Sequence, residues 1–293
     1  MNHKAGFVNI VGSPNVGKST LMNTLVGNKL SIITSKAQTT RQRTMGMVNS
    51  DEFQIVFSDT PGIIQPKYKL QESMVRYITA ALGDADILLY MTDIKDHPDR
   101  NEDFIKKIAD IHIPVLLVIN KIDLSDEKTV LELSKTWETV LPSAELYLIS
   151  ALKKFNTEVL LKRIVTLLPE HPPYYPKDQI TDRSERFLAS EMIREKILLF
   201  YRQEIPYSVQ IEIENFKEEN KLIRISALIF VTRESQKAIL IGKGGTSLKK
   251  AATSARLDME KFFEKKIFLE LFIKVKKDWR NNERLLKEWG YSS

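Results

Sequence analysis

The stretch that decides the fold is Gly12-Ser-Pro-Asn-Val-Gly-Lys-Ser19. It follows a short apolar run, residues 7–11, and opens an amphipathic segment that extends to Val26. A strand, a glycine-rich turn and a helix in this order are typical of the phosphate-binding P-loop. Glycines let backbone N–H groups surround an anion, and the N-terminus of the helix adds partial positive charge. The sequence therefore predicts an α/β domain of the P-loop class, with a mostly parallel sheet, that binds a nucleoside triphosphate.

The loop also supplies side chains for phosphate and metal binding. We expect Lys18 to reach the β- and γ-phosphates and the Ser19 hydroxyl to ligate Mg²⁺. The predicted nucleotide-binding residues of this stretch are Gly12, Ser13, Pro14, Asn15, Val16, Gly17, Lys18, Ser19 and Thr20.

Three further motifs each follow an apolar run. Asp59-Thr-Pro-Gly62 comes after residues 53–57, Asn120-Lys-Ile-Asp123 after residues 115–119, and Ser150-Ala151 after residues 146–149. Ligands of open parallel sheets bind outside the carboxyl ends of the strands, so the motifs should converge on one crevice. They add to the predicted nucleotide site the residues Asp59, Thr60, Pro61, Gly62, Asn120, Lys121, Asp123, Ser150 and Ala151.

The second of these motifs favours guanine as the base. The Asp123 carboxylate can accept hydrogen bonds from both N1–H and the 2-amino group of guanine, which adenine does not offer. We expect Asn120 to bond the base edge and brace the loop, and the Lys121 stem to cover the base. The Ala151 N–H would donate to O6. A buried polar group that loses its partner is costly, so adenine should be rejected and GTP or GDP bound.

These motifs resemble those of the translation-factor-related GTPases. The resemblance implies GTP hydrolysis and a switch threonine within residues 38–41. We expect Thr40 to be the second protein ligand of Mg²⁺, with Thr39 as the alternative, and Asp59 to hold a metal-bound water. The Gly62 N–H would contact the γ-phosphate, so that Lys18, Thr40 and Gly62 stabilise the transition state.

The residue after the Asp59-Thr-Pro-Gly62 motif limits the mechanism. Many small GTPases carry a glutamine there that orients the attacking water, but this chain has Ile63, followed by Ile64. No general base can be assigned. Asn15 resembles the asparagine that binds K⁺ in potassium-activated relatives. We therefore expect slow intrinsic turnover that K⁺ and a bound partner stimulate.

The chain changes character near residue 170. Residues 168–176 hold 4 of the 11 prolines and read as a semi-rigid connector. Acidic and basic side chains balance in residues 1–175, so the whole net charge of +6 lies beyond them and suggests a polyanionic partner. The predicted organisation is a GTP-binding G domain over 1–168, a proline-rich linker over 169–182, and a second domain over 183–293.

The second domain has its own pattern. A helix is predicted over 188–202, strands over 207–216 and 222–231, a helix from 235 into Gly242-Lys-Gly-Gly245, a long helix over 246–263 and a strand over 267–275. This α+β order resembles the type II KH domain, whose GXXG loop contacts about four single-stranded nucleotides. A helix cap followed by a turn remains the alternative for the glycines. The RNA-binding candidates are Ile239, Leu240, Ile241, Gly242, Lys243, Gly244, Gly245, Lys249 and Lys250.

A G domain followed by a type II KH domain resembles the Era family of bacterial ribosome-assembly GTPases. Residues 36–41, 234–237 and 276–280 extend the resemblance beyond the motifs above. It implies that the KH domain binds the single-stranded 3′ end of 16S rRNA on the maturing small (30S) ribosomal subunit, and that the GTP state presents this site. We expect a monomer, and a loop over residues 65–73 that contacts the linker or the KH domain in one nucleotide state.

Composition excludes several other classes. The chain has no cysteine, and its four histidines show no metal-ligand spacing. No apolar run reaches 18 residues and no signal peptide precedes the first strand, so we expect a cytoplasmic protein. Its basic half leaves one alternative open, which is a signalling GTPase peripheral to the inner face of the cell membrane. Such a protein would use the KH fold for protein or lipid contacts.

Overall fold

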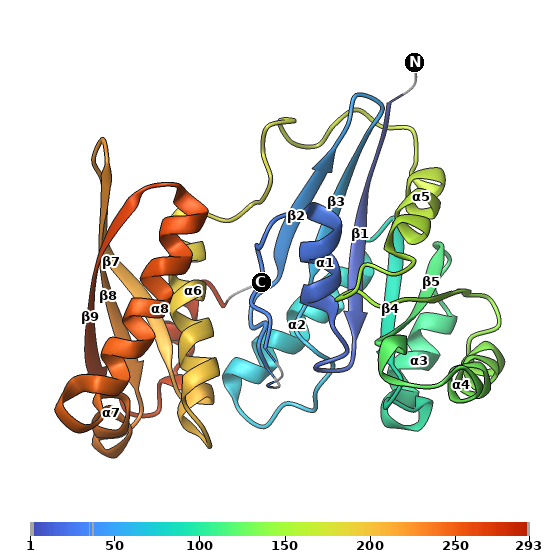
Figure 1. Ribbon diagram of the computed structural model, residues 1–293. Coiled ribbons are helices and arrows are strands. Elements are labelled where there is room, and N and C mark those ends of the chain that lie inside the picture. Colours follow the sequence, from blue (N-terminus) through green and yellow to red (C-terminus); the bar gives the residue numbers. More distant parts are fainter. Residues whose placement is uncertain (1–2, 35, 37, 292–293) are drawn as a thin grey trace. The chain divides into compact units, whose positions relative to one another are not determined.

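The computed structural model describes residues 3–34, 36 and 38–291, which form two compact units (Figure 1). Unit 1 takes in residues up to 66 and residues 74–182, and unit 2 takes in residues 67–73 and those from 183 onward. The predicted linker, 169–182, belongs to unit 1. The Gln54 Oε1 accepts hydrogen bonds from the backbone N–H groups of Tyr174 and Tyr175 at 2.7 and 3.0 Å, and the Thr181 hydroxyl donates to the Met45 carbonyl at 2.7 Å. Hydrogen bonds therefore hold residues 169–182 against the two strands of unit 1 that contain Gln54 and Met45.

Unit 1 contains a six-stranded sheet in the order β2-β3-β1-β4-β5-β6. Five strands run parallel, namely β1 (Lys4–Gly12), β3 (Phe53–Asp59), β4 (Ile87–Asp93), β5 (Val115–Asn120) and β6 (Glu145–Leu148). The edge strand β2 (Thr44–Asn49) is antiparallel to β3. The continuous apolar runs of β1, β4 and β5 reflect burial on both faces, as expected for parallel strands. The predicted mostly parallel sheet is confirmed.

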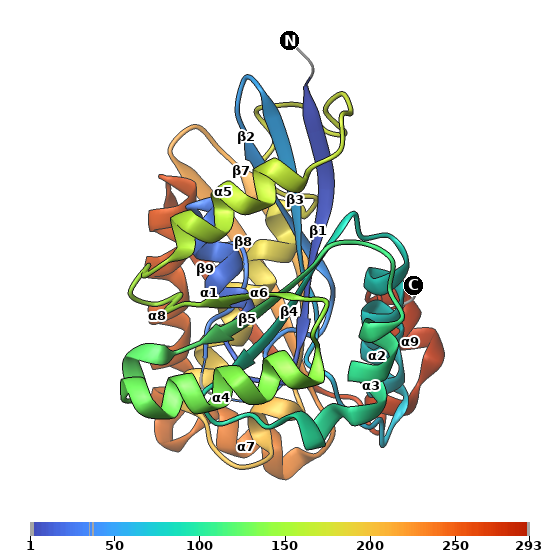
Figure 2. The same ribbon diagram turned by 90° about the vertical axis from the view of Figure 1, so that its right-hand side faces the viewer.

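Helices cover both faces of this sheet (Figure 2). α1 (Lys18–Val26) and α5 (Thr157–Leu167) pack on one face, where Leu21 and Ile164 join a core with Ile10 and Phe57. α2 (Lys69–Gly83), α3 (Glu102–Ala109) and α4 (Glu127–Val140) pack on the other, around the buried Trp137. The carboxyl ends of β1, β3, β5 and β6 lead directly into the four predicted motifs.

Unit 2 follows the predicted order of helix, two strands, two helices and a strand. These elements are α6 (Glu185–Phe200), β7 (Gln210–Glu218), β8 (Leu222–Val231), α7 (Glu234–Ile241), α8 (Thr246–Phe263) and β9 (Lys266–Val275). β8 is central, antiparallel to β7 and parallel to β9. Side chains of all three helices join the sheet in one core that includes Ile197, Leu240 and Met259. A short last helix, α9 (Glu283–Glu288), was not predicted from the sequence.

Candidate nucleotide site and nucleic-acid interface

The P-loop of unit 1 is shaped by glycines that no other residue could replace. Gly12 has φ 148° and a Cβ there would lie 1.9 Å from the Met91 carbonyl oxygen. Gly17, with φ 103°, precedes the first residue of α1. The loop curls around the buried Lys18, whose Nζ donates to the carbonyls of Gly12 at 3.0 Å and Ser13 at 2.8 Å. A phosphate that entered the loop would offer Lys18 a stronger, charged acceptor than these carbonyls.

Burial also sets the charge state of Lys18. Desolvation lowers its pKa to about 8, although the carboxylates of Asp59 and Asp96 oppose the change. Asp96 is itself buried and lies in the loop after β4. Its influence on the P-loop was not foreseen, because no motif marks that loop.

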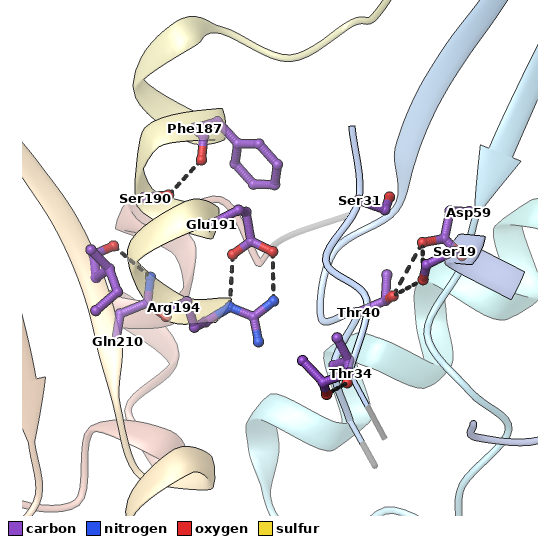
Figure 3. Close-up of polar contacts among 12 residues, drawn as sticks. Ser19, Ser31, Thr34, Thr40, Asp59, Phe187, Ser190, Glu191, Arg194 and Gln210 are labelled. Atoms are coloured by element: carbon purple, nitrogen blue, oxygen red, sulfur yellow. Dashed lines mark hydrogen bonds and ion pairs between the residues drawn. The ribbon is translucent and has the colours of Figure 1, made fainter. Parts of the chain in front are cut away.

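Three side-chain oxygen atoms that could ligate a metal ion lie together beside the P-loop (Figure 3). The Ser19 hydroxyl donates to Asp59 Oδ2 at 2.7 Å, the Thr40 hydroxyl donates to the same oxygen at 3.1 Å, and the two hydroxyl oxygens lie 3.0 Å apart. Thr39, the alternative ligand, instead donates to the Lys36 carbonyl at 2.6 Å. The structure thus places Thr40 with the other two predicted metal residues. Ala37, in the 36–41 stretch that extends the family resemblance, lies outside the described residues.

The donor set fits a hard cation. Asp59 is fully buried, and its Oδ1 and the Ser31 hydroxyl have no partner of hydrogen-bond geometry among the described residues, although Ser31 lies close enough to lower the pKa of Asp59. Burial raises the pKa of Asp59, while the Ser19 hydrogen bond and the charge of Lys18 oppose that rise. A buried carboxylate oxygen without a partner, next to two hydroxyls, suits Mg²⁺ or one of its bound waters, because Mg²⁺ prefers oxygen ligands.

The segment after β3 approaches the P-loop closely. A Cβ at Gly62 would lie 2.7 Å from the Pro14 Cα, so this contact requires glycine. The next residue, Ile63, donates its backbone N–H to the Gly12 carbonyl at 3.1 Å. The apolar Ile63 side chain offers no group that could orient a water.

The motifs after β5 and β6 brace the P-loop from the other side. Asn120 donates to the Val16 carbonyl at 2.8 Å and accepts from the Ala151 N–H at 2.9 Å. Lys121 Nζ donates to the Asn15 carbonyl at 2.5 Å and to Asp93 at 2.6 Å. The Ala151 N–H, expected at guanine O6, is therefore engaged with Asn120 in this structure.

A cleft of about 400 Å³ joins these motifs. Most predicted nucleotide-binding residues line it, namely Pro14, Asn15, Gly17, Lys18, Ser19, Thr20, Thr60, Gly62, Asn120, Lys121, Asp123 and Ser150, and the predicted metal ligand Thr40 lines it as well. Six others are not among its lining, namely Gly12, Ser13, Val16, Asp59, Pro61 and Ala151. The cleft thus has the shape and the polar groups of a nucleotide site.

Sequence reasoning missed the apolar part of this cleft. The cleft is also lined by residues that were not predicted to bind the nucleotide, namely Ile32, Ile33, Thr34, Gln38, Leu124 and Leu152. Thr39, the alternative metal ligand, lines it too. Leu124 and Leu152 are 65% and 74% exposed, and each follows directly after a base-recognition motif. A leucine directly after each of these motifs was the signal available in the sequence. They give the base end of the cleft an apolar rim.

The glycine loop of unit 2 is a tight turn between α7 and α8. Gly242, Gly244 and Gly245 have φ values of 73°, 60° and 77°, and a Cβ at Gly242 would lie 2.3 Å from the Ser247 hydroxyl. The Tyr201 hydroxyl donates to the Leu240 carbonyl at 2.7 Å and so fixes the last turn of α7. The loop backbone is therefore open to a ligand at Gly244 and Gly245, where an added Cβ would meet no neighbour.

The charges around this loop differ from those of the adjoining sheet. Lys243, Lys249 and Lys250 make no ion pair with any described residue, whereas Lys217, Lys265 and Lys274 pair with glutamates. The excess positive charge near the loop is thus available to an anionic partner. Of the apolar candidates, Ile239 is 54% exposed, but Leu240 is fully buried in the core and cannot line a groove.

The fold and the two sites define a P-loop GTPase with a C-terminal KH domain. Family models agree, because residues 7–121 match the "50S ribosome-binding GTPase" model and residues 204–280 match the KH domain model. Full-length relatives then identify the family. The chain is 48% identical to the GTPase Era of Syntrophus aciditrophicus, over 99% of this chain and 95% of that protein, and 44% identical to the GTPase Era of a Thermoanaerobacter species, over 100% and 98%.

Solved structures give the same assignment. The chain superposes with a TM-score of 0.95 at 41% identity on Era in complex with MgGDPNP and nucleotides 1506–1542 of 16S ribosomal RNA, covering 99% of this chain and 100% of that one. Its TM-score to an Aquifex aeolicus Era variant bound to GDP·AlF₄⁻ is 0.93, at the same identity and coverage. The chain belongs to the Era family of GTPases.

Proposed function

We propose that this Era-family GTPase binds the single-stranded 3′ region of 16S rRNA through its KH domain and assists assembly of the small ribosomal subunit in the cytoplasm. The GTP-bound state favours the RNA contact and hydrolysis permits release. The observation that carries the proposal is the trio Lys243, Lys249 and Lys250, free of ion pairs beside an open glycine loop. The relative solved with 16S rRNA supports the choice of RNA.

The residues of unit 1 divide the work of hydrolysis. Backbone N–H groups of the P-loop and Lys18 hold the β- and γ-phosphates, and the Gly62 N–H contacts the γ-phosphate. Ser19 and Thr40 would ligate Mg²⁺, and Asp59 would accept from one of its waters. When bound, Mg²⁺ neutralises charge that develops on the phosphates. No described side chain next to Gly62 can act as a base, so turnover is slow.

We further propose that Asn15 helps bind K⁺ and that the ion supplies charge in place of an arginine. Asn15 lines the cleft with φ 66°, and its carbonyl is held by Lys121. Asn15→Asp should therefore change how GTP turnover depends on K⁺ relative to Na⁺. Turnover with unchanged K⁺ dependence would remove the ion from the proposal and leave the rest standing.

The domain boundaries proposed from these features are 1–168 for the G domain, 169–182 for the connector and 183–293 for the KH domain, in a monomeric protein. The alternative function, a switch peripheral to the cell membrane, is not favoured by the family assignment. In the part of the chain that the structure describes, no helix is long and apolar enough to cross a membrane. Any lipid contact would be a weak surface association.

The test is the affinity for the RNA of nucleotides 1506–1542, measured for Lys243→Asp and for Lys217→Asp at one salt concentration. Both variants change the charge equally, but Lys217 lies on β7 and pairs with Glu219. We expect about a tenfold loss for Lys243→Asp and little change for Lys217→Asp, because phosphate contacts dominate affinity. Equal effects of the two variants, or weaker binding of Lys243→Asp to anionic lipid vesicles alone, would contradict RNA binding at the loop.

A further inference from the structure

The last turn of α6 exposes apolar side chains that the proposed function leaves without a role. Leu199 is 50% exposed and Phe200 is 40% exposed, while the next residue, Tyr201, is buried. Phe200 is also the last residue of its helix. An aromatic ring left half in water at a helix end is a candidate for contact with a partner.

This turn lies beside the glycine loop. Tyr201 donates its hydroxyl to the Leu240 carbonyl, two residues before Gly242, at 2.7 Å. Lys250, in the second turn of α8, places its Nζ 4.9 Å from the centroid of the Phe200 ring. The ends of three helices therefore meet around the loop, and Figure 1 shows α6 and α8 reaching α7 at the same end of unit 2.

The combination of groups is the one that single-stranded nucleic acid requires. Proteins bind such strands with cations that follow the phosphates and aromatic rings on which bases stack. Lys243, Lys249 and Lys250 supply cations without ion-pair partners, and Phe200 supplies a ring next to them. Base–aromatic stacking is stronger than an exposed contact between a cation and a ring, so a base can displace the Lys250 ammonium from the ring.

We propose that Phe200 is a stacking platform for one RNA base just outside the glycine loop. Lys250 then turns from the ring to the neighbouring phosphate. This inference rests on the proposed function, since it assumes that the loop binds RNA. It adds a residue from α6 to an interface otherwise built by the loop and by α8.

The chain contains a matched control. Phe268 is 45% exposed and lies under the Arg224 guanidinium, which is 5.3 Å from its ring centroid. It follows the C-terminal end of α8, however, and the 18 residues of that helix span about 27 Å. Phe268 thus has the exposure and the cation of Phe200 without its proximity to the loop.

The experiment measures binding of the RNA of nucleotides 1506–1542 to the full chain carrying Phe200→Leu, Phe200→Trp or Phe268→Leu. Leucine keeps an apolar side chain but cannot stack, so we expect about a tenfold loss of affinity for Phe200→Leu. Phe200→Trp should bind at least as well as the parent, and Phe268→Leu should be unchanged. Thermal melts of each variant check that the fold is kept.

A second readout reports stacking directly. RNA with 2-aminopurine at single purine positions should lose fluorescence at one position on binding the parent, and recover it with Phe200→Leu. If Lys243→Asp weakens binding but both leucine variants bind like the parent, Phe200 is no platform while the proposed function stands. If the parent shows no preference for this RNA over a scrambled one, the proposed function itself fails.

Discussion

Lys18 illustrates how burial prepares a residue for its ligand. The ammonium is held by two carbonyl oxygens, and its desolvation is only partly offset by Asp59 and Asp96. The neutral amine is therefore accessible near pH 8 in the nucleotide-free protein. Bound phosphates favour the charged form, because an opposite charge at close range raises the pKa of an amine.

The protein should therefore take up protons when nucleotide binds. Above about pH 8 much of Lys18 is neutral before binding and charged afterwards, so GTP binding should take up protons there and almost none at pH 6.5. Calorimetry in two buffers of different ionisation enthalpy measures the uptake. Lys18→Arg stays protonated throughout and serves as the control. Heats at pH 8.5 that do not depend on the buffer would contradict the predicted charge state.

Individual residues also show where sequence reasoning stops. The motifs located the nucleotide cleft, since each sits directly after a buried strand whose carboxyl end the fold brings there. The sequence favoured Thr40 as the Mg²⁺ ligand but left Thr39 as an alternative. Which of two neighbouring threonine hydroxyls faces the metal site depends on the path of the backbone, which the sequence does not reveal. Leu124 and Leu152 were missed, because apolar residues that line a cleft carry no motif.

Among the elements, β2 begins directly after a buried side chain, Arg43, that adds to the pairing of this strand with β3. The Arg43 guanidinium donates to Ser58 at 2.5 Å, to Asn9 at 3.1 Å and to both carboxylate oxygens of Asp84, at the end of α2. Asn9 in turn donates to Asp84 at 2.7 Å. Arg43 therefore links β1, β2 and β3 to α2, three residues after Thr40.

Removal of this link should destabilise β2 locally. Arg43→Ala leaves Asn9 and Ser58 buried without their partner and should cost about 2 kcal/mol, because hydrogen bonds of charged groups are strong when buried. Hydrogen exchange of the β2 amides should then be about 30-fold faster. Arg163→Ala removes an exposed pair with Glu145, which water and salt screen, so it should leave the exchange of the β2 amides almost unchanged. Comparable exchange in the two variants would show that the Arg43 network adds nothing beyond a surface pair.

The segment over residues 65–73 is the element where we expect nucleotide state to act. Lys67–Ser73 groups with unit 2, and there Lys69 pairs with Glu283 at 3.3 Å. The segment follows Gly62, whose N–H is expected at the γ-phosphate, so loss of that phosphate should release it. Limited proteolysis at Lys67 and Lys69 should therefore be faster with GDP than with a non-hydrolysable GTP analogue. Identical cleavage in both states would mean that this segment is no switch.

The strands before the four motifs of unit 1, its first helix and the main elements of unit 2 were predictable from their apolar patterns. β5 is a continuous apolar run, and α8 carries helical spacing over its whole length. α9 was missed because it has only six residues, and its position depends on partners far away in the sequence, such as the contacts of the adjoining Trp289 with Glu212 and Phe230. The proline-rich stretch 169–182 was expected to be a linker, but its hydrogen bonds to β2 and β3 could not be read from its composition.

At the scale of the whole molecule, the nucleotide cleft and the surplus positive charge lie in different parts of the chain. The nucleotide cleft lies in the electrically balanced residues 1–175, and the surplus of +6 lies in the remainder. Within that remainder, Lys217, Lys265 and Lys274, on or beside the sheet, pair with glutamates, whereas Lys243, Lys249 and Lys250 at the glycine loop make no ion pair with any described residue. A GTPase built in this way can hold a polyanion at one site and respond to nucleotide at another.

The most direct test of nucleotide-gated RNA binding is the affinity of the full chain for the RNA of nucleotides 1506–1542, with GDP and then with a GTP analogue. Both measurements use one salt concentration and a scrambled RNA beside the real one, because phosphate contacts alone give salt-dependent binding. We predict tighter, sequence-dependent binding with the GTP analogue. Equal binding of both RNAs in both nucleotide states would contradict the gating and leave a GTPase with a basic domain of other purpose.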